Sequence, residues 1–492
     1  MSAIKNFLAD CEKKRKGVLR KLKKGVNEKG MKAVILAGGF GTRLRPLTLT
    51  KPKPMIPLVN KPVIEHVVDY LVSYGLNDII VTTTFFGEMI VEHFRNRSDM
   101  HLSFPPEPFP LGTAGSVKNA GLDKEAEPFV VIQGDNITDL NLRGLLDFHY
   151  ESGGLVTIAL THVEDPWNYG IAQLGGNGCI ERFHEKPDKG ECFSDLASTG
   201  IYVIDPKAMD FVPEKIPFDF AKDLFHLLHA KKKGSMFGYE IEAGNFWADV
   251  GQPEGYLNAM EWMLKRARRD VIIGDNVEIT SSGIIGPTVI GNSVVVEENC
   301  MVGPNTVLFD DVYIARNANL EQCFIGEQTI TGQNACIKGA IIGAHCELGK
   351  DVEVLNGKIW PYVTIPHRTT VDSTIKRYVC FNGDETCGGI GGNEDLLRTV
   401  RDEEAFYFNM RKGGKIVHTG FVAHSLKEFA EIFDKVDLKS IEYHLREGCN
   451  DFAAWIRDVF RHNELAEEVA ESQWWWPRKK LISGILRRLS EG

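Results

Sequence analysis

The sequence predicts an α/β domain, then a parallel β-helix, then a small, mainly helical domain. A short apolar run near residue 31 leads directly into a glycine-rich turn, and further apolar runs alternate with helical stretches up to about residue 265. A six-residue period follows. The predicted segments are a basic extension (1–30), the α/β domain (31–265), a hexapeptide-repeat β-helix (270–368), a Gly-rich linker (380–394), an accessory domain (395–470) and a Trp/basic tail (471–492).

The α/β domain begins with a buried-strand pattern at residues 32–37, which glycines 38, 39 and 41 follow at once. A strand that feeds a glycine loop is typical of a turn that binds phosphate. Later apolar runs have helical stretches between them, at residues 79–81, 129–132, 155–160 and 200–204. This alternation predicts a largely parallel sheet.

After the helical stretch 254–269, aliphatic residues recur six positions apart. The series is Val271, Val277, Val289, Val295, Met301 and Val307, with only Gly283 breaking it. A hexapeptide rhythm with small residues at the corners predicts a parallel β-helix with three short strands per coil. Each coil buries its aliphatic stack only against its neighbours, so we expect the ends to need partners. A homo-oligomer through the β-helix is therefore expected.

Composition excludes several classes of protein. The net charge of −10 in 492 residues argues against a general nucleic-acid binder. The chain has no apolar run of the roughly 18 residues that cross a bilayer, and the first 30 residues lack the apolar centre of a signal peptide. We expect a cytoplasmic protein. Its ten cysteines include no C-x-x-C pair, so reduced thiols are expected instead of a zinc site.

The strongest chemical signal is the string from Leu36 to Thr48, which continues at 51–57 as Lys-Pro-Lys-Pro-Met-Ile-Pro. Its glycines allow the backbone to approach a polyphosphate closely. Arg43 and Lys53 add positive charge for oxygens that become more negative during displacement. The string is not a Walker loop, because no Gly-Lys-Ser/Thr follows, and its spacing differs from Gly-x-Gly-x-x-Gly.

This string resembles the signature of the sugar nucleotidyltransferases, the nucleoside-diphosphate-sugar pyrophosphorylases. Later motifs agree in kind and order, at 110–115, 133–136, 168–170, 184–187, 198–202 and 246–251. The resemblance implies a Rossmann-like catalytic domain followed by a left-handed parallel β-helix. It also implies an enzyme that transfers a nucleotidyl group from an NTP to a sugar-1-phosphate and releases pyrophosphate, with Mg²⁺ as cofactor.

The resemblance also assigns roles to individual residues. The catalytic residues would be Arg43, Lys53 and Asp135, and the metal would be held by Asp135 and Asp249. The nucleotide would be bound by Leu36, Ala37, Gly38, Gly39, Gly41, Thr42, Arg43 and Gly112. The sugar phosphate would be bound by Asn136, Tyr169, Gly170, Glu185, Lys186 and Thr199.

The loop at 110–115, the Asn-Lys-Pro run at 60–62 and the attached β-helix look most like mannose-1-phosphate guanylyltransferases. This likeness favours GTP and mannose-1-phosphate as substrates and GDP-mannose, a glycan precursor, as product. Uridylyl-, thymidylyl- or adenylyltransfer to glucose-1-phosphate stays open, because a few backbone and side-chain groups can decide which nucleotide base the enzyme accepts. A non-catalytic subunit that senses nucleotide-sugar is the alternative of another class. Against it stand the charged residues Arg43, Lys53, Asp135, Lys186 and Asp249, which are all present.

The remaining parts leave more than one interpretation open. The β-helix is an assembly or regulatory platform, or an acyltransferase with His345 as its base. In the accessory domain, His444 and Asp451 form a small polar site, or they pack and cap a helix. The tail, with tryptophans at 474–476, packs on that domain or contacts a membrane surface. The extension, with ten basic residues against three acids, is a solvated helix, a partner-binding arm or an untranslated stretch.

Overall fold

The structure is a computed structural model that describes residues 30–39, 41–83, 87–107, 110–375, 405–412, 415–433 and 450–460, with residues 436, 440, 444, 466 and 467. The chain divides into two compact units, Met1–Val379 and Cys380–Gly492. Apart from Gly30, the predicted basic extension lies outside the described residues, as do the Gly-rich linker and the Trp/basic tail. None of the helices in the described ranges is long and apolar enough to cross a membrane.

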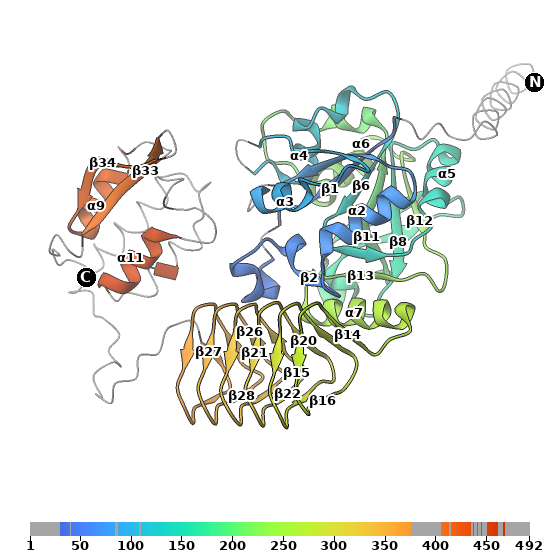
Figure 1. The fold of residues 1–492 in the computed structure, drawn as a ribbon. Coiled ribbons are helices and arrows are strands. Elements are labelled where there is room, and N and C mark those ends of the chain that lie inside the picture. Colours follow the sequence, from blue (N-terminus) through green and yellow to red (C-terminus); the bar gives the residue numbers. More distant parts are fainter. Residues whose placement is uncertain are drawn as a thin grey trace, which may run out of the picture. The chain divides into compact units, whose positions relative to one another are not determined.

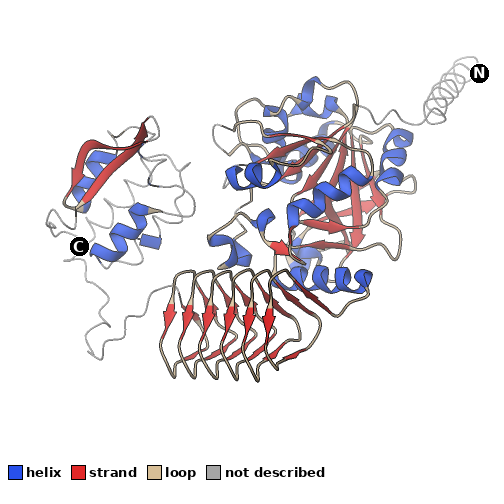
Figure 2. Ribbon diagram, viewed as in Figure 1, coloured by secondary structure: helices blue, strands red, loops and turns tan. Residues whose placement is uncertain are grey.

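The α/β domain of the first unit is built on a nine-stranded sheet (Figures 1 and 2). The central order is β10-β9-β11-β6-β1-β4-β5, and β8 pairs with both β11 and β12. The strands are β1 (Lys32–Leu36), β4 (Asp78–Thr82), β5 (His101–Ser103), β6 (Phe129–Gln133), β8 (Val156–His162), β9 (Gly170–Leu174), β10 (Ile180–Glu185), β11 (Leu196–Ile204) and β12 (Met236–Glu240).

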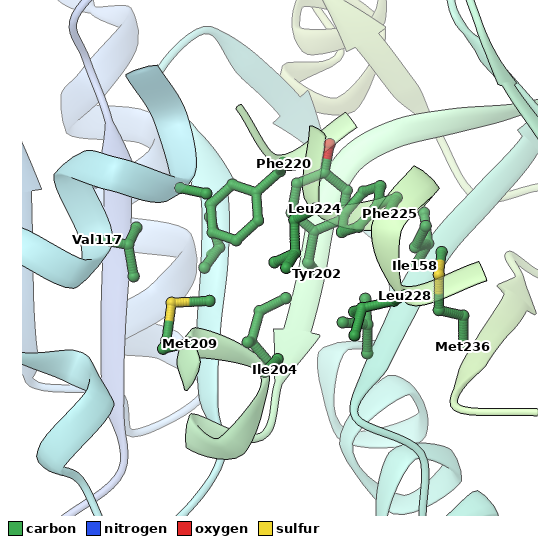
Figure 3. Close-up of a cluster of buried hydrophobic side chains, with 14 of the residues drawn as sticks. Val117, Ile158, Tyr202, Ile204, Met209, Phe220, Leu224, Phe225, Leu228 and Met236 are labelled. Carbon is green, nitrogen blue, oxygen red and sulfur yellow. The ribbon is translucent and has the colours of Figure 1, made fainter. Parts of the chain in front are cut away.

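Helices cover both faces of this sheet, because side chains of a strand alternate between its faces. Ala33 and Ile35 of β1 belong to the hydrophobic cluster that contains α2 (Val63–Ser73), α3 (Gly87–Phe94) and α5 (Leu142–Ser152). Val34 and Leu36 belong to the cluster that contains α4 (Gly112–Asn119) and α6 (Phe225–Lys231). In Figure 3, Phe220, Leu224 and Phe225 pack in this second cluster against Tyr202 of β11. The domain is thus a three-layer α/β structure.

The expectation of a largely parallel sheet is right for β5, β4, β1 and β6 and for the β8–β12 pair, and it is wrong for β9, β10 and β11. Strands β5, β4, β1 and β6 are parallel, but β11 runs antiparallel to β6, β8 and β9. Between β8 and β11 the chain forms the antiparallel β9–β10 pair, with Gly178 at φ +78 in the turn. A tight turn replaces a helical crossover there, and only such a crossover would keep the strands parallel.

The β-helix consists of three parallel sheets (Figure 2). The first sheet contains β14 (Val271–Ile273), β17 (Thr288–Ile290), β20 (Thr306–Leu308), β23 (Phe324–Ile325), β26 (Ile341–Ile342), β29 (Lys358–Ile359) and β32 (Thr374–Ile375). The second contains β15 (Glu278–Ile279), β18 (Val295–Val296), β21 (Tyr313–Ile314), β24 (Ile330–Thr331), β27 (Glu347–Leu348) and β30 (Thr364–Ile365). The third contains β16 (Gly283–Ile284), β19 (Met301–Val302), β22 (Asn319–Glu321), β25 (Cys336–Lys338), β28 (Glu353–Leu355) and β31 (Thr370–Val371).

The six-residue period of the β-helix is confirmed, but the interior stack begins one residue later than the valine series suggested. Fully buried positions six apart include Ile290, Val296, Val302 and Leu308. In contrast, Met301 of the predicted series is 43% exposed. Neighbouring side chains of a strand point to opposite faces, so a one-residue difference in phase exchanges inside for outside.

The outward residues of the first sheet are apolar because they contact the α/β domain. Val289, Val307, Phe324 and Ile341 share one hydrophobic cluster with residues of α7 (Pro253–Ala267) and of the segment 44–63. We call this first sheet the docking sheet. Figure 1 shows the blue segment after β1, together with α7, between the α/β sheet and the top of the β-helix.

Three of the four cysteines in the β-helix are buried packing residues, and Cys336 is half-buried. Cys300, Cys323 and Cys346 are buried and free. Burial raises the pKa of the Cys323 thiol to about 12 and that of Cys346 to about 11. Thiols with such pKa values stay protonated and are poor nucleophiles.

The second unit contains a β-hairpin in addition to the expected helices. Strands β33 (Phe406–Lys412) and β34 (Lys415–Ala423) are antiparallel, and α9 (Leu426–Phe433) and α11 (Asp451–Phe460) follow. His444 is buried among aromatic rings, and its Nδ1 lies 2.9 Å from Oδ2 of Asp451, the first residue of α11. This geometry supports the interpretation of the pair as packing at a helix start.

Candidate active site

The glycine loop follows β1 at the carboxyl edge of the sheet, where open α/β sheets place ligand sites. Gly41 has φ +59, and a Cβ there would lie 2.7 Å from Thr48 Cγ2 and 2.9 Å from Lys53 Cβ. The Thr48 hydroxyl donates to the carbonyl of Gly41 at 2.8 Å. Only glycine fits this position, and the tight loop holds Gly41 against the segment that carries Lys53.

Two carboxylates that are far apart in sequence meet beside this loop. Asp135 immediately precedes β7 (Asn136–Thr138), and Asp249 ends β13 (Trp247–Asp249). These two strands pair antiparallel, with Asp249 opposite Asn136. The Val250 amide donates to the Asp135 carbonyl at 3.0 Å, which extends the pairing to the two acids.

Close backbone packing fixes the Asp249 side chain. The Gly251 amide donates to Asp249 Oδ1 at 2.8 Å. A Cβ at Gly251 would lie 2.7 Å from the same oxygen and 2.5 Å from the Lys53 ammonium, and a Cβ at Gly255 would lie 2.0 Å from the Asp249 carbonyl oxygen. Gly255 therefore tolerates no side chain, and a side chain at Gly251 would displace the Lys53 and Asp249 side chains.

Lys53 lies between the two carboxylates. Its Nζ contacts Asp135 Oδ2, and it lies 3.2 Å from Asp249 Oδ1. Arg43 Nη2 is 3.9 Å from Asp249 Oδ2. Burial lowers the pKa of the Lys53 ammonium, and the Asp249 carboxylate opposes this shift. The lysine side chain is only 11% exposed, so both carboxylates and the ammonium are poorly solvated and interact strongly.

Arg43, Lys53 and Asp135 line a cavity of about 180 Å³, whereas Asp249 contacts Lys53 and Arg43 but is not part of the cavity wall. Eight of the predicted site residues contribute to its wall, namely Leu36, Ala37, Gly39, Gly41, Thr42, Arg43, Lys53 and Asp135. Three lining residues were not singled out from the sequence, namely Pro54, Gln133 and Gly251. Gln133 ends β6 two residues before Asp135, so its place at the strand's carboxyl end was the signal that could have found it.

The cavity suits a divalent cation. Asp135 and Asp249 offer hard oxygen donors, and the Lys53 ammonium shows that a positive charge already fits between them. In the described ranges, no group of three or more His, Cys, Asp or Glu side chains is placed to hold a metal. A cation held by two carboxylates would complete its coordination with phosphate oxygens and water, as Mg²⁺ commonly does.

A second group of predicted residues lies on the β9–β10 side of the sheet. Gly170 and Glu185 pair across these strands, and a Cβ at Gly170 would lie 2.6 Å from Glu185 Oε2. Burial raises the pKa of Glu185, and Lys186, whose Nζ lies 3.9 Å from Glu185 Oε1, opposes this shift. Lys186 adopts φ +48, and its amide donates to the Tyr169 carbonyl at 3.0 Å.

Two predicted residues form hydrogen bonds within the fold. The buried Asn136 side chain donates to the Thr199 carbonyl at 2.6 Å, and the Trp247 indole donates to the same carbonyl at 2.9 Å. The Thr199 hydroxyl donates to the Ala159 carbonyl at 2.8 Å. Tyr169 packs edge-on against Trp247, with 5.5 Å between ring centroids. The hydrogen bonds of Asn136 and Trp247 to Thr199 thus join β7 and β13 to β11.

Gly112 starts α4 and does not line the cavity described above. It has φ +71, and a Cβ there would lie 2.7 Å from the Phe218 carbonyl oxygen. The amides of Ala114 and Gly115 donate to that carbonyl at 3.0 Å each. Gly112 therefore allows the segment around Phe218 to pack directly on the start of α4.

A glycine loop, two carboxylates that meet beside it and flanking cations define a class of enzyme that handles nucleotide phosphates at the carboxyl edge of an α/β sheet. Comparison with known families agrees. Residues 32–266 match the family model described as nucleotidyl transferase. Residues 284–379 match a model described as the GMPPB C-terminal domain, and residues 391–471 match a family of unknown function (DUF5752).

Similar proteins extend over both the α/β domain and the β-helix. Mannose-1-phosphate guanylyltransferase 1 of Arabidopsis thaliana is 32% identical over 338 residues, which are 66% of this chain and 90% of that protein. The mannose-1-phosphate guanyltransferase of Schizosaccharomyces pombe is 34% identical over 370 residues, 70% and 99% of the two chains. A mannose-1-phosphate guanylyltransferase catalytic subunit beta of Dictyostelium discoideum is 34% identical over 336 residues, 67% and 90%.

The chain belongs to the nucleotidyl transferase family. It is an enzyme that transfers a nucleotidyl group from an NTP to a sugar-1-phosphate and forms an NDP-sugar.

Proposed function

We propose that this enzyme joins GTP to mannose-1-phosphate and releases GDP-mannose and pyrophosphate in a Mg²⁺-dependent reaction. The observation that carries the chemistry is that Asp135, Lys53 and Arg43 line the glycine-loop cavity and that Asp249 contacts both of these cations. The names of the relatives, which match over both domains, support the choice of substrates.

The residues divide the work by charge. The backbone amides of the glycine loop and the Arg43 guanidinium would bind the NTP phosphates. Lys53 would stabilise the negative charge that grows on the α-phosphate oxygens during displacement. Bound Mg²⁺, held by Asp135 and Asp249, would supply Lewis-acid neutralisation of the phosphates.

The sugar phosphate would bind on the β9–β10 side. Lys186 would bind its phosphate as a point charge, and Glu185 would accept hydrogen bonds from sugar hydroxyls. Tyr169, Gly170, Asn136 and Thr199 would shape this side of the site. The phosphate of the sugar would attack the α-phosphorus directly, with pyrophosphate as leaving group and without a covalent enzyme intermediate.

The test is pyrophosphate release by the purified protein with Mg²⁺, across GTP, UTP, dTTP, ATP and CTP, each paired with mannose-1-phosphate or glucose-1-phosphate. We expect the GTP and mannose-1-phosphate pair to exceed every other pair in kcat/KM. A higher kcat/KM for a glucose-1-phosphate pair would replace the proposed substrates. If a folded protein that binds nucleotide-sugar released no pyrophosphate with any pair, the enzymatic proposal would be contradicted.

We also propose that the chain forms a homo-oligomer through its β-helix. The strands β14, β15 and β16 of the first coil each stand at the end of their sheet. Ile273 and Ile285, which belong to or follow these strands, are 48% and 43% exposed, which is high for isoleucine. An open strand edge with apolar side chains favours contact with a second copy.

The oligomer proposal is tested by light scattering coupled to size-exclusion chromatography. We expect the wild type to exceed the mass of one chain, and the Ile273→Asp/Ile285→Asp variant to elute as a monomer. A Val91→Asp variant serves as control, because Val91 is equally exposed, at 43%, on α3 of the α/β domain. A monomeric wild type, or an unchanged mass in the double variant, would contradict this interface.

A further inference from the structure

The segment that carries Lys53 holds a second lysine with the opposite orientation. Lys53 contacts Asp135 and Asp249, whereas Lys51, two residues earlier, pairs with Glu327 of the β-helix. Lys51 Nζ lies 2.8 Å from Glu327 Oε1. A residue of the β-helix is therefore connected to the active-site lysine through three consecutive residues of the backbone.

This ion pair differs from the surface pairs of the β-helix. Lys51 and Glu327 are only 16% and 22% exposed, and Lys51 Nζ lies 5.9 Å from the Phe309 ring. Glu321 and Lys338 also pair, at 3.3 Å, but they are 39% and 45% exposed. An ion pair that is shielded from water constrains its side chains more strongly than an exposed one does.

A second contact fixes the other end of the same segment. The Asn60 side chain donates to the Ile290 carbonyl of the docking sheet at 2.7 Å. Asn60 and the preceding Val59 both have positive φ, at +59 and +51, in the turn between β2 (Pro57–Leu58) and β3 (Lys61–Pro62). The β-helix thus contacts this segment on both sides of Lys53.

Hydrophobic contacts fill the space between the two polar anchors. Leu47, Ile56 and Leu58 of the segment are buried in one cluster with Phe309 and Val307 of the β-helix. The segment 47–60 itself contains only short helical turns and the two-residue strand β2. Its conformation therefore depends on what it packs against, because so little regular structure supports it internally.

We propose that Glu327 is a positioning residue for Lys53, and that the β-helix thereby forms part of the catalytic apparatus in addition to any role in assembly. Through its ion pair with Lys51, Glu327 fixes the position of the backbone at residues 51–53, and this position places the Lys53 ammonium beside Asp135 and Asp249. The proposal rests on the nucleotidyl transfer assigned to that cavity.

The test compares Glu327→Gln, Lys51→Ala, Lys51→Arg and the double variant Lys51→Ala/Glu327→Gln in the full chain. We expect Glu327→Gln and Lys51→Ala each to lower kcat between about 10-fold and 100-fold, since small displacements of catalytic groups have effects of this size. KM for the NTP should change by less than about 3-fold. The double variant should resemble either single one, because both remove the same interaction. Lys51→Arg, which keeps the charge, should retain most of the activity.

The matched control is Glu321→Gln, which removes a carboxylate from an exposed Lys–Glu pair of the same β-helix. It should leave kcat unchanged. If Glu321→Gln and Glu327→Gln lowered kcat equally, Glu327 would contribute only to the stability of the β-helix, and the proposal would be overturned. An unchanged kcat in Glu327→Gln would overturn it as well.

Hydrogen exchange separates this proposal from the identity of the substrates. In Glu327→Gln, amides of residues 50–56 should exchange faster than in the wild type, whereas those of β1 should not change. This readout requires no substrate, so it remains informative if no substrate pair is active. Unchanged exchange at 50–56 would contradict the positioning role even where activity falls.

Discussion

Replacing Asp135 by asparagine is expected to lower kcat by about 1,000-fold or more, with the fold intact. The substitution keeps the shape of the side chain but removes the charge that pairs with Lys53 and that would hold a divalent cation. Losing electrostatic stabilisation of a phosphoryl transition state has effects of this size. Steady-state pyrophosphate release with saturating substrates measures the change.

The control for Asp135→Asn is Asp78→Asn. Asp78 begins β4 at the opposite edge of the same sheet and is 40% exposed. This variant should keep the activity of the wild type, and thermal unfolding should show that both variants are folded. Residual activity of Asp135→Asn within about 10-fold of the wild type would remove Asp135 from the catalytic group, since direct metal and phosphate contacts are worth more than that.

Replacing Lys53 by methionine is expected to have two effects. It should lower kcat between about 100-fold and 1,000-fold, because the ammonium proposed to stabilise the phosphate oxygens is lost. It should also lower the thermal unfolding midpoint without metal, because Asp135 and Asp249, each 18% exposed, would then face each other unpaired. Added Mg²⁺ should raise the midpoint of this variant more than that of the wild type, since the lysine no longer competes for the carboxylates.

Thermal unfolding of Lys53→Met with and without MgCl₂, beside initial rates, tests both effects. Lys61→Met is the matched control, because Lys61 pairs with Asp69 on the surface and not with the cavity. Its response to Mg²⁺ should equal that of the wild type. An equal Mg²⁺ response in Lys53→Met would contradict the view that the ammonium and a divalent cation share Asp135 and Asp249.

Much of the cavity was predictable because its chemistry is local. The glycines and cations between Leu36 and Lys53 lie close together in the chain, and their backbone requirements are visible as a strand followed by a glycine turn. Six-residue periodicity likewise identified the β-helix, since each coil repeats the same local geometry. These features need no knowledge of distant partners.

Pairing and orientation came only from the tertiary structure. The antiparallel alignment of β7 with β13 decides that Asp135 meets Asp249, and nothing in either segment alone specifies this register. The mixed character of the sheet was hidden for the same reason. A run of apolar residues at β11 is compatible with parallel or antiparallel neighbours.

The sequence by itself predicted the fold class, and it predicted the glycine loop and most of the charged residues that line the cavity. The tertiary structure decided which side chains face each other. Two adjacent aliphatic positions in the β-helix look alike in sequence, yet Leu308 points into its interior and Val307 packs on the α/β domain. The sequence likewise does not distinguish Lys51 from Lys53, yet Lys51 pairs with Glu327 and Lys53 pairs with Asp135. Periodicity fixes which residues alternate, but long-range packing alone supplies the partner on each side.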